Sequence, residues 1–154
     1  MIYRALEATS GSPVVLKVLR GTAPSNRQLR RFQQEFEITH SLTSPHVVEA
    51  LSLERVGDSE MIILKDTHAV DLRTFTPPGG MPVAEALDVA LSICEALAFI
   101  HDRGIIHRDI NPSNIIRTPD SSAIQLIDFG LSTRFSHTET QTTPCLLYTS
   151  DAAD

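Results

Sequence analysis

Short apolar runs and one amphipathic stretch alternate in the first third of the chain. The apolar runs are rich in aliphatic residues and are bounded by turn residues, which is typical of strands. Between the second and third runs, Phe32 and Phe36 lie on an apolar stripe at helical spacing. Ser25 or Asn26 can cap the helix that this stripe indicates. The pattern predicts strand, strand, helix, strand and strand over residues 2–8, 14–19, 26–42, 47–53 and 61–65.

A break at residues 77–80, Pro-Pro-Gly-Gly, separates this β-rich part from a helical part. Residues 82–102 carry the longest helical pattern, and Gly104 ends it. We expect the apolar stripe of this helix to face the core, so that the Cys94 thiol is buried and inert. The stripe consists of Leu87, Ala90, Leu91, Cys94, Ala98 and His101. With short strands expected at 105–106, 115–116 and 124–127, the pattern predicts an α+β chain of two small lobes.

Composition and charge narrow the classes of function. The 154 residues are 42% hydrophobic, which suffices for a core, and the net charge of −6 argues against nucleic acid or an anionic membrane as a partner. No apolar run is long enough to span a bilayer, and Arg4 and Glu7 interrupt the N-terminus before a signal peptide could form. Cys94 and Cys145 make neither a disulfide framework nor a metal cluster. We therefore expect a cytoplasmic protein.

Two short motifs of the second part carry the candidate chemistry. Residues 107–114 read HRDINPSN and resemble the catalytic loop of protein kinases, and residues 128–130 read DFG and resemble the Mg²⁺-binding element of that family. The resemblance implies that Asp109 orients the substrate hydroxyl and accepts its proton, and that Asn114 and Asp128 bind Mg²⁺. An isolated DFG after a strand is usually only a turn, but both motifs in this order indicate a protein kinase that uses ATP and Mg²⁺.

A lysine and a glutamate of the first part complete the resemblance. Lys17 ends the apolar segment VVLK, which resembles the kinase strand whose lysine holds the α- and β-phosphates of ATP. Outside that family, such a lysine is ordinarily an edge or surface residue. In the family, a helix glutamate pairs with the lysine. We choose Glu35 over Glu37 because of its spacing from Pro45, in a segment that resembles the one after the kinase helix.

Residues 62–67 resemble the strand and hinge that hold adenine in protein kinases. The resemblance makes Leu64 the gatekeeper, and the Lys65 carbonyl and the Thr67 amide the hinge contacts. Asp71 has two open interpretations, a ribose-binding carboxylate or a helix cap. The apolar residues expected around the adenine ring, for which ordinary core packing is the alternative, are Ile2, Val15 and Ile116.

The INPSN form of the catalytic loop suggests a narrower group. It is similar to the N-terminal serine/threonine kinase domain of large bacterial signalling proteins, which continue into AAA-type ATPase, GAF and sensor histidine kinase modules. The resemblance implies a protein substrate, with those modules as partners. Asn111 stands where most of these kinases place a lysine for the γ-phosphate, which implies weaker transition-state stabilisation. Thr39 replaces an aliphatic residue of the internal spine, and Arg108 is retained where an arginine can pair with a phosphorylated activation loop.

The resemblance covers about residues 2–138 and implies a protein-kinase-like bilobal fold, truncated at both ends. We expect a partial domain over 1–143, with a small lobe at about 1–66, a hinge at about 65–71 and a partial large lobe at about 72–143. The glycine-rich loop expected before Ile2 and an A-P-E motif are missing, so we expect the chain by itself to be inactive. Residues 144–154 resemble adapter read-through and are expected to be a non-native or disordered tail, with a divergent activation loop as the alternative.

Two other functions stay open on the sequence. A pseudokinase-like ATP-binding regulatory module is weakly favoured by Asn111. The retained residues count against it, namely Lys17, Asp109, Asn114 and Asp128. A small-molecule phosphotransferase of the aminoglycoside type shares the arrangement of two lobes, but Arg108 and the DFG triplet argue against it.

Overall fold

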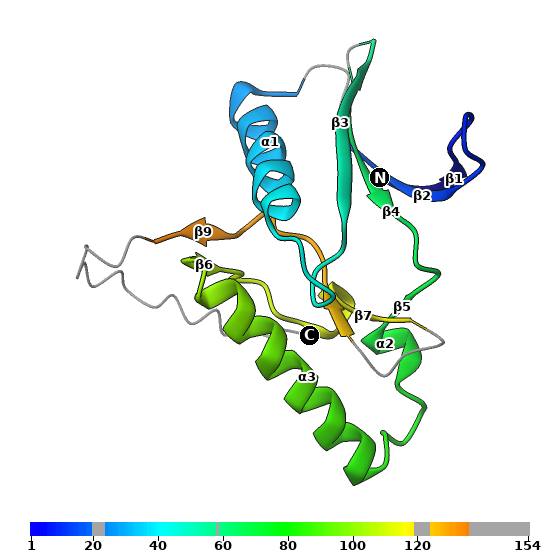
Figure 1. The fold of residues 1–154 in the computed structure, drawn as a ribbon, viewed down its shortest axis with the longest axis vertical. Coiled ribbons are helices and arrows are strands. Elements are labelled where there is room, and N and C mark those ends of the chain that lie inside the picture. Colours follow the sequence, from blue (N-terminus) through cyan, green and yellow to red (C-terminus); the bar gives the residue numbers. More distant parts are fainter. Residues whose placement is uncertain (20–23, 58, 119–123, 136–154) are drawn as a thin grey trace, which may run out of the picture.

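A four-stranded antiparallel sheet forms the first part of the chain in the computed structural model (Figure 1). The structure describes residues 1–19, 24–57, 59–118 and 124–135. The strand order is β1-β2-β4-β3, so the two hairpins lie side by side through β2 and β4. The bounds are β1 Ile2–Leu6, β2 Pro13–Val18, β3 Ala50–Val56 and β4 Ser59–Lys65.

One helix, α1 (Asn26–Ser41), lies beside this sheet (Figure 1). It begins with a capping box, in which the Ser25 side chain accepts from the Gln28 backbone N–H and the Gln28 side chain accepts from the Ser25 N–H. The buried face carries Phe32 and Ile38 at helical spacing, together with a glutamate, Glu35. A carboxyl on a buried helix face requires a partner, which the site below supplies.

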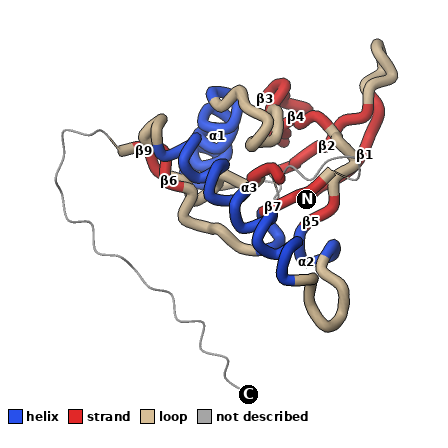
Figure 2. The backbone as a smooth tube through the Cα atoms, turned by 60° about the horizontal axis from the view of Figure 1, so that its bottom comes forward, coloured by secondary structure: helices blue, strands red, loops and turns tan. Residues whose placement is uncertain are grey.

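The second part contains a three-stranded sheet with order β5-β7-β8 and a separate pair of strands, β6 and β9. Figure 2 shows β6 and β9 side by side, away from β5 and β7. The bounds of the strands are β5 Val70–Asp71, β6 Ile105–Ile106, β7 Ile115–Arg117, β8 Ile124–Leu126 and β9 Thr133–Arg134. The helices are α2 Leu72–Phe75, α3 Val83–His101 and the 3-10 turn η1 Pro112–Asn114.

The segment between α1 and β3 joins the two parts. The Leu126 backbone N–H donates to the His46 carbonyl at 2.8 Å, and the Val48 N–H donates to the Leu126 carbonyl at 3.2 Å. Around this junction one core contains residues of both parts, including Ile38 of α1 and Ile100 of α3. Among the described residues, the buried cluster consists of Ile38, Leu42, Val47, Ala96, Ile100, Ile105, Ile115, Ile124, Leu126 and Phe129. Because the parts share a core, small shifts of α1 are transmitted to the segment that contains Phe129.

The predicted core face of α3 is wrong. The buried residues of the helix are Val89, Ala96 and Ile100, whereas Leu91 is 64% exposed and Cys94 is exposed. Apolar side chains occupy most of the circumference of α3, so the sequence contains two stripes at helical spacing. Tertiary packing determines which of the two stripes is buried, and helical periodicity alone does not predict it.

Two expected boundaries also shift. The strand expected at 47–53 begins at Ala50, because residues 46–48 pair with Leu126 of β8. The break at 77–80 connects α2 to α3, since β5 already pairs with β7 before it. Residues 144–154, including Cys145, lie outside the described part. Among the described residues, no helix has the length and apolar character that a membrane crossing requires. The expected α+β organisation in two parts is confirmed.

Candidate active site

A cavity of about 610 Å³ lies between the two sheets, lined by residues of both parts. It brings together residues that are far apart in the sequence, from β1 at the N-terminus to the DFG segment. The expected site residues among its lining are Ile2, Val15, Lys17, Glu35, Leu64, Lys65, Thr67, Asp71, Asn114, Ile116 and Asp128. Asp109 is not among the lining residues, and it is positioned through its contacts with Asn114.

Lys17 connects the two parts across this cavity. Its Nζ lies 2.5 Å from Glu35 Oε1 and 2.9 Å from Asp128 Oδ1. The Lys17 side chain is 20% exposed and the Glu35 side chain 9%, so this pair is largely shielded from water. Glu37, the alternative partner, is exposed. The structure therefore places Glu35, one helical turn from the buried Phe32 and Ile38, in the position to hold Lys17.

Burial acts in opposite directions on the two members of this pair. Burial raises the pKa of Glu35, and the Lys17 ammonium opposes this without reversing it. For Lys17, burial lowers the pKa, but the carboxylates of Glu35 and Asp128 outweigh that effect and hold the pKa above its ordinary value. Lys17 is thus a cation at neutral pH.

Gly130 provides the space in which the two carboxylates approach Lys17. A Cβ at this position would lie 3.1 Å from Asp128 Oδ1 and 3.2 Å from Glu35 Oε2. The Gly130 backbone N–H also donates to Asp128 Oδ1 at 3.3 Å. A side chain at position 130 would therefore force these carboxylates to shift by a few tenths of an ångström.

Two asparagines hold the carboxylate of Asp109. Asn114 Nδ2 donates to Asp109 Oδ2 at 2.8 Å and to the Asp109 carbonyl at 3.0 Å. Asn111 Nδ2 lies 3.2 Å from both the carbonyl and Oδ1 of Asp109, while its own Oδ1 accepts from the Ser113 N–H at 2.9 Å. Asn111 thus orients Asp109 in this chain. A lysine at the same position would supply charge but has no acceptor for the Ser113 N–H.

His107 is a buried side chain that contacts both the HRD and the DFG segment. It is 1% exposed, its ring lies 4.7 Å from the Phe129 ring, and its Nε2 lies 3.0 Å from the Ile127 carbonyl. The Asp109 N–H donates to Nδ1 at 3.3 Å, so the proton of the neutral ring is on Nε2. Burial lowers the pKa of His107, which keeps the ring neutral. The histidine therefore connects the catalytic loop to the DFG segment without charge.

The backbone is strained at both the HRD and the DFG segment. Arg108 has φ 69° and Asp128 has φ 64°, the left-handed region that non-glycine residues rarely adopt. Each such residue costs of order 1–3 kcal/mol and persists where surrounding contacts fix it. At Asp128 these contacts include Lys17 and the Gly130 N–H, so the strain serves to aim the carboxylate into the cavity.

The apolar end of the cavity contains the residues expected around the base. Ile2 pairs with Lys17 and Val15 pairs with Leu64 in the sheet register, which places these strands over one wall. Ile116 of β7 lies on the wall formed by the second part. Asp71 caps α2, because its Oδ1 accepts from the Thr74 N–H at 2.8 Å, and this hydrogen bond lowers the pKa of Asp71. The cap geometry is thus present, and Asp71 still lines the cavity.

Thr39, which stands where the resemblance implies an aliphatic residue, makes a hydrogen bond within α1. Thr39 is buried and its Oγ1 donates to the Glu35 carbonyl at 2.8 Å. Its neighbour Ile38 and the nearby Leu42 belong to the buried cluster that contains Phe129. Aliphatic packing between α1 and the DFG segment is therefore present. The sequence interpretation missed Ile38 because it followed the Phe32–Phe36 stripe, and it also missed Arg4 and Asp66, which line the cavity.

The oxygen donors of the site suit a magnesium ion. Within the described ranges, no three or more His, Cys, Asp or Glu side chains gather as a metal-binding group. Asp128 and Asn114 line the same cavity and offer a carboxylate and an amide oxygen. Mg²⁺ is commonly bound by one or two carboxylates together with substrate phosphates and water, so this donor set fits the ion.

Comparison with known proteins agrees with this geometry. Residues 1–150 match the family described as Protein kinase domain. The chain is 30% identical over 153 residues to the probable serine/threonine-protein kinase pknA2 of Bifidobacterium longum, covering 96% of this chain and 20% of that protein. It is 32% identical over 139 residues to PrkC of Bacillus subtilis (89% and 21%) and 37% identical over 125 residues to PknF of Mycobacterium tuberculosis (76% and 26%).

These relatives are named as serine/threonine-protein kinases, and the chain spans about a quarter of their length or less. The family match covers nearly the whole chain, and the cavity contains the lysine, glutamate, asparagine and aspartate side chains that phosphoryl transfer requires. This chain belongs to the protein kinase domain family.

Proposed function

We propose that this domain transfers the γ-phosphoryl group of ATP to a serine or threonine hydroxyl of a protein. The observation that carries the proposal is the bridge made by Lys17 between Glu35 and Asp128 across the cavity. It places a fixed cation and an Mg²⁺-type ligand within 2.9 Å of each other at one end of an apolar cleft. The names of the bacterial relatives support serine or threonine as the acceptor.

Each residue has a distinct task in this proposal. Lys17, held by Glu35, binds the oxygens of the α- and β-phosphates. Asp128 and Asn114 hold Mg²⁺, which offsets the phosphate charge when bound. Asp109 orients the substrate hydroxyl and accepts its proton while the hydroxyl oxygen forms a bond to the γ-phosphorus. The bond from that phosphorus to the bridging oxygen breaks, and its electron pair leaves with ADP.

Asn111 affects the rate of this reaction. It contributes two contacts to Asp109 and no charge, so it positions the base without stabilising the transferred phosphoryl group. We infer slower transfer than in a kinase with lysine at this position. A purely regulatory ATP-binding module remains the rival function, and the ordered contacts of Asp109 give it no support.

The direct test compares wild type with Asp109→Ala in the longest reading frame that contains these residues. Radiolabelled γ-phosphate transfer to a generic acceptor protein should fall at least a hundredfold in the variant, with ATP binding retained. Equal transfer by both proteins would remove Asp109 from the mechanism. ATP binding without transfer in wild type would select the regulatory module.

The wider setting of the domain is also a proposal. The INPSN loop supports a parent protein in which this domain acts on, or is regulated by, sensor and histidine kinase modules of the same chain. We place the protein in the cytoplasm because its proposed reaction consumes ATP. Mass spectrometry of phosphorylated sites in cells that contain or lack the gene tests the substrate class, and a lack of serine or threonine sites that depend on the gene contradicts it.

A further inference from the structure

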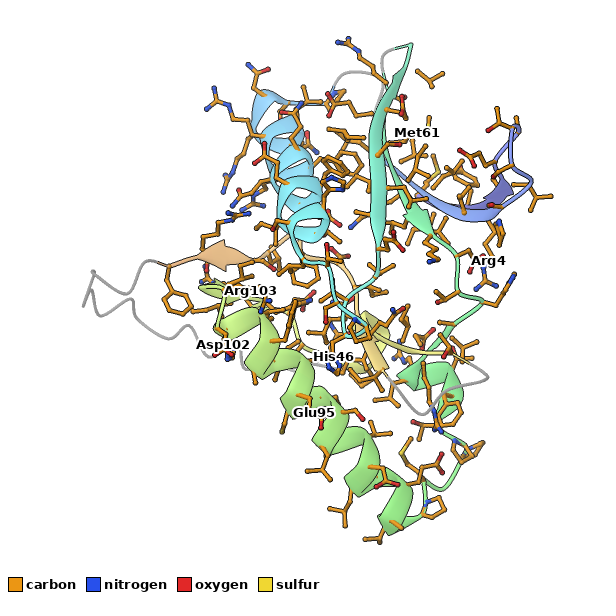
Figure 3. The ribbon with its side chains drawn as sticks, in the orientation of Figure 1. Arg4, His46, Met61, Glu95, Asp102 and Arg103 are labelled. Carbon is orange, nitrogen blue, oxygen red and sulfur yellow. The ribbon has the colours of Figure 1, made fainter. Side chains whose placement is uncertain are left out.

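An arginine of the first strand reaches across the mouth of the cavity to the connection between β4 and β5. Figure 3 shows Arg4 beside this connection. Arg4 Nε lies 3.0 Å from Asp66 Oδ2, and Arg4 Nη2 donates to the Ala69 carbonyl at 3.1 Å. Arg4, Asp66 and Ala69 all line the cavity. We call this set of contacts the Arg4–Asp66 clamp.

The two charged ends of the clamp lie in different environments. The Arg4 side chain is 60% exposed, whereas the Asp66 side chain is 4% exposed. An exposed ion pair usually contributes little, but a shielded carboxylate that loses its cation keeps only its hydrogen bonds as compensation. Asp66 is thus a fixed anchor, and Arg4 is the partner that neutralises it.

The clamp also determines the path of the backbone. Asp66 Oδ1 accepts from the His68 N–H at 2.7 Å, and His68 has φ 55°, in the left-handed region. The Asp66 N–H donates to the Pro13 carbonyl at 3.2 Å. With Arg4 on the Ala69 carbonyl, residues 66–69 are held at four points in a strained turn.

Lys65 and Thr67, whose backbone groups are expected to contact the base, are the sequence neighbours of Asp66. Their orientation therefore depends on the clamp. We propose that Arg4 is a positioning residue for the purine base, acting through Asp66 and the turn at residues 66–69. This inference rests on the proposed function, because it assumes that the cavity binds ATP.

The clamp predicts a specific pattern of nucleotide affinities. Arg4→Ala should weaken the binding of both adenosine and Mg²⁺–ATP about tenfold, equivalent to about 1.4 kcal/mol, because both ligands contain the base. Asp66→Asn should act in the same direction, and Arg4→Lys should restore part of the affinity. Lys17→Met should weaken Mg²⁺–ATP by a larger factor than adenosine, since Lys17 lies at the phosphate end of the cavity.

Titration calorimetry on the full chain measures these affinities, with circular dichroism to compare folding. The matched control is Glu49→Gln, which breaks the neighbouring Lys65–Glu49 ion pair of 3.0 Å, where both side chains are more than half exposed. This control should leave adenosine affinity within twofold of wild type. A variant that only loses folded protein lowers the binding stoichiometry and leaves the affinity unchanged, which would overturn the positioning role.

The possible failures are distinguishable. If wild type binds neither adenosine nor ATP, the proposed function is wrong, and the positioning role of Arg4 is wrong with it. If wild type binds both and Arg4→Ala binds adenosine as tightly, the positioning role is overturned and the proposed function stands. Weakened ATP binding with unchanged adenosine binding in Arg4→Ala would also overturn the positioning role, because Arg4 would then act on the phosphates.

Discussion

Glu35→Gln separates the stability of the fold from the activity of the site. The substitution keeps the shape of the side chain and removes its charge from a position that is 9% exposed. Lys17 retains Asp128 as an ionic partner at 2.9 Å, so no cation is left unpaired. The variant therefore tests whether Glu35 serves the reaction or the fold.

The effect on stability follows from the raised pKa of Glu35. A carboxyl whose pKa is higher in the folded state binds protons more readily there, so the ionised form costs stability at neutral pH. This cost disappears as the pH falls to about 4.5, the ordinary pKa of the group. Glutamine removes the cost, and we expect a free energy of unfolding equal to wild type or about 1 kcal/mol higher at pH 7.

The effect on activity has the opposite sign. A hydrogen bond to a charged group contributes about 1.5–3 kcal/mol, and without the Glu35 carboxylate Lys17 moves toward Asp128. We expect kcat/KM for ATP to fall about 10- to 100-fold.

The assay is phosphate transfer at varied ATP in the longest reading frame that contains these residues, together with urea unfolding at pH 7 and pH 5. Glu37→Gln is the matched control, because Glu37 is the exposed neighbour on the same helix, and it should behave as wild type. Wild-type kcat/KM in Glu35→Gln, or an equal loss in Glu37→Gln, would refute the reasoning.

Three further predictions concern other parts of the site. Gly130→Ala places a Cβ 3.1 Å from Asp128 Oδ1 and should raise the Mg²⁺ concentration required for ATP binding about tenfold in a metal titration; unchanged Mg²⁺ dependence contradicts it. Burial lowers the pKa of His107 below 6.5, so the unfolded state takes up a proton at a higher pH than the folded state does. The free energy of unfolding should therefore decrease as the pH drops below 6.5, with a slope of at most about 1.4 kcal/mol per pH unit. Urea unfolding checks this, and a His107→Phe variant with the same pH slope would refute it. Asn111→Ala frees the Asp109 carboxylate and should lower kcat several-fold with KM for ATP unchanged in steady-state kinetics, whereas an unchanged kcat would show that Asn114 alone suffices.

The catalytic motifs could be located from the sequence because their residues are close together in the chain. Asp109 and Asn114 are held by contacts within one loop, so their spacing in the sequence already indicates that their side chains meet. Lys17 and Glu35 could be chosen because one is the single lysine of an apolar strand and the other has the expected spacing from Pro45. For such residues the local pattern and the tertiary structure give the same answer.

Other features depend on contacts between distant segments. Arg4 and Asp66 are far apart in the sequence, and no local motif indicates that their side chains meet. The face of α3 was predicted wrongly because apolar residues nearly surround that helix, and Leu91 is exposed while Ala96 is buried. Val47 and Val48 were assigned to the strand predicted at 47–53, but they pair with Leu126 of β8 instead. In each case a distant partner determines the outcome.

The most direct test of the central claim is the site at which an ATP acyl phosphate labels the chain. This reagent transfers its acyl group to a lysine close to the bound phosphates, and the chain contains only two lysines, Lys17 and Lys65. The account predicts that mass spectrometry finds the acyl group on Lys17, and that excess Mg²⁺–ATP suppresses the labelling. Labelling of the exposed Lys65 alone, or labelling of Lys17 that ATP does not suppress, would contradict the claim that the phosphates bind at Lys17.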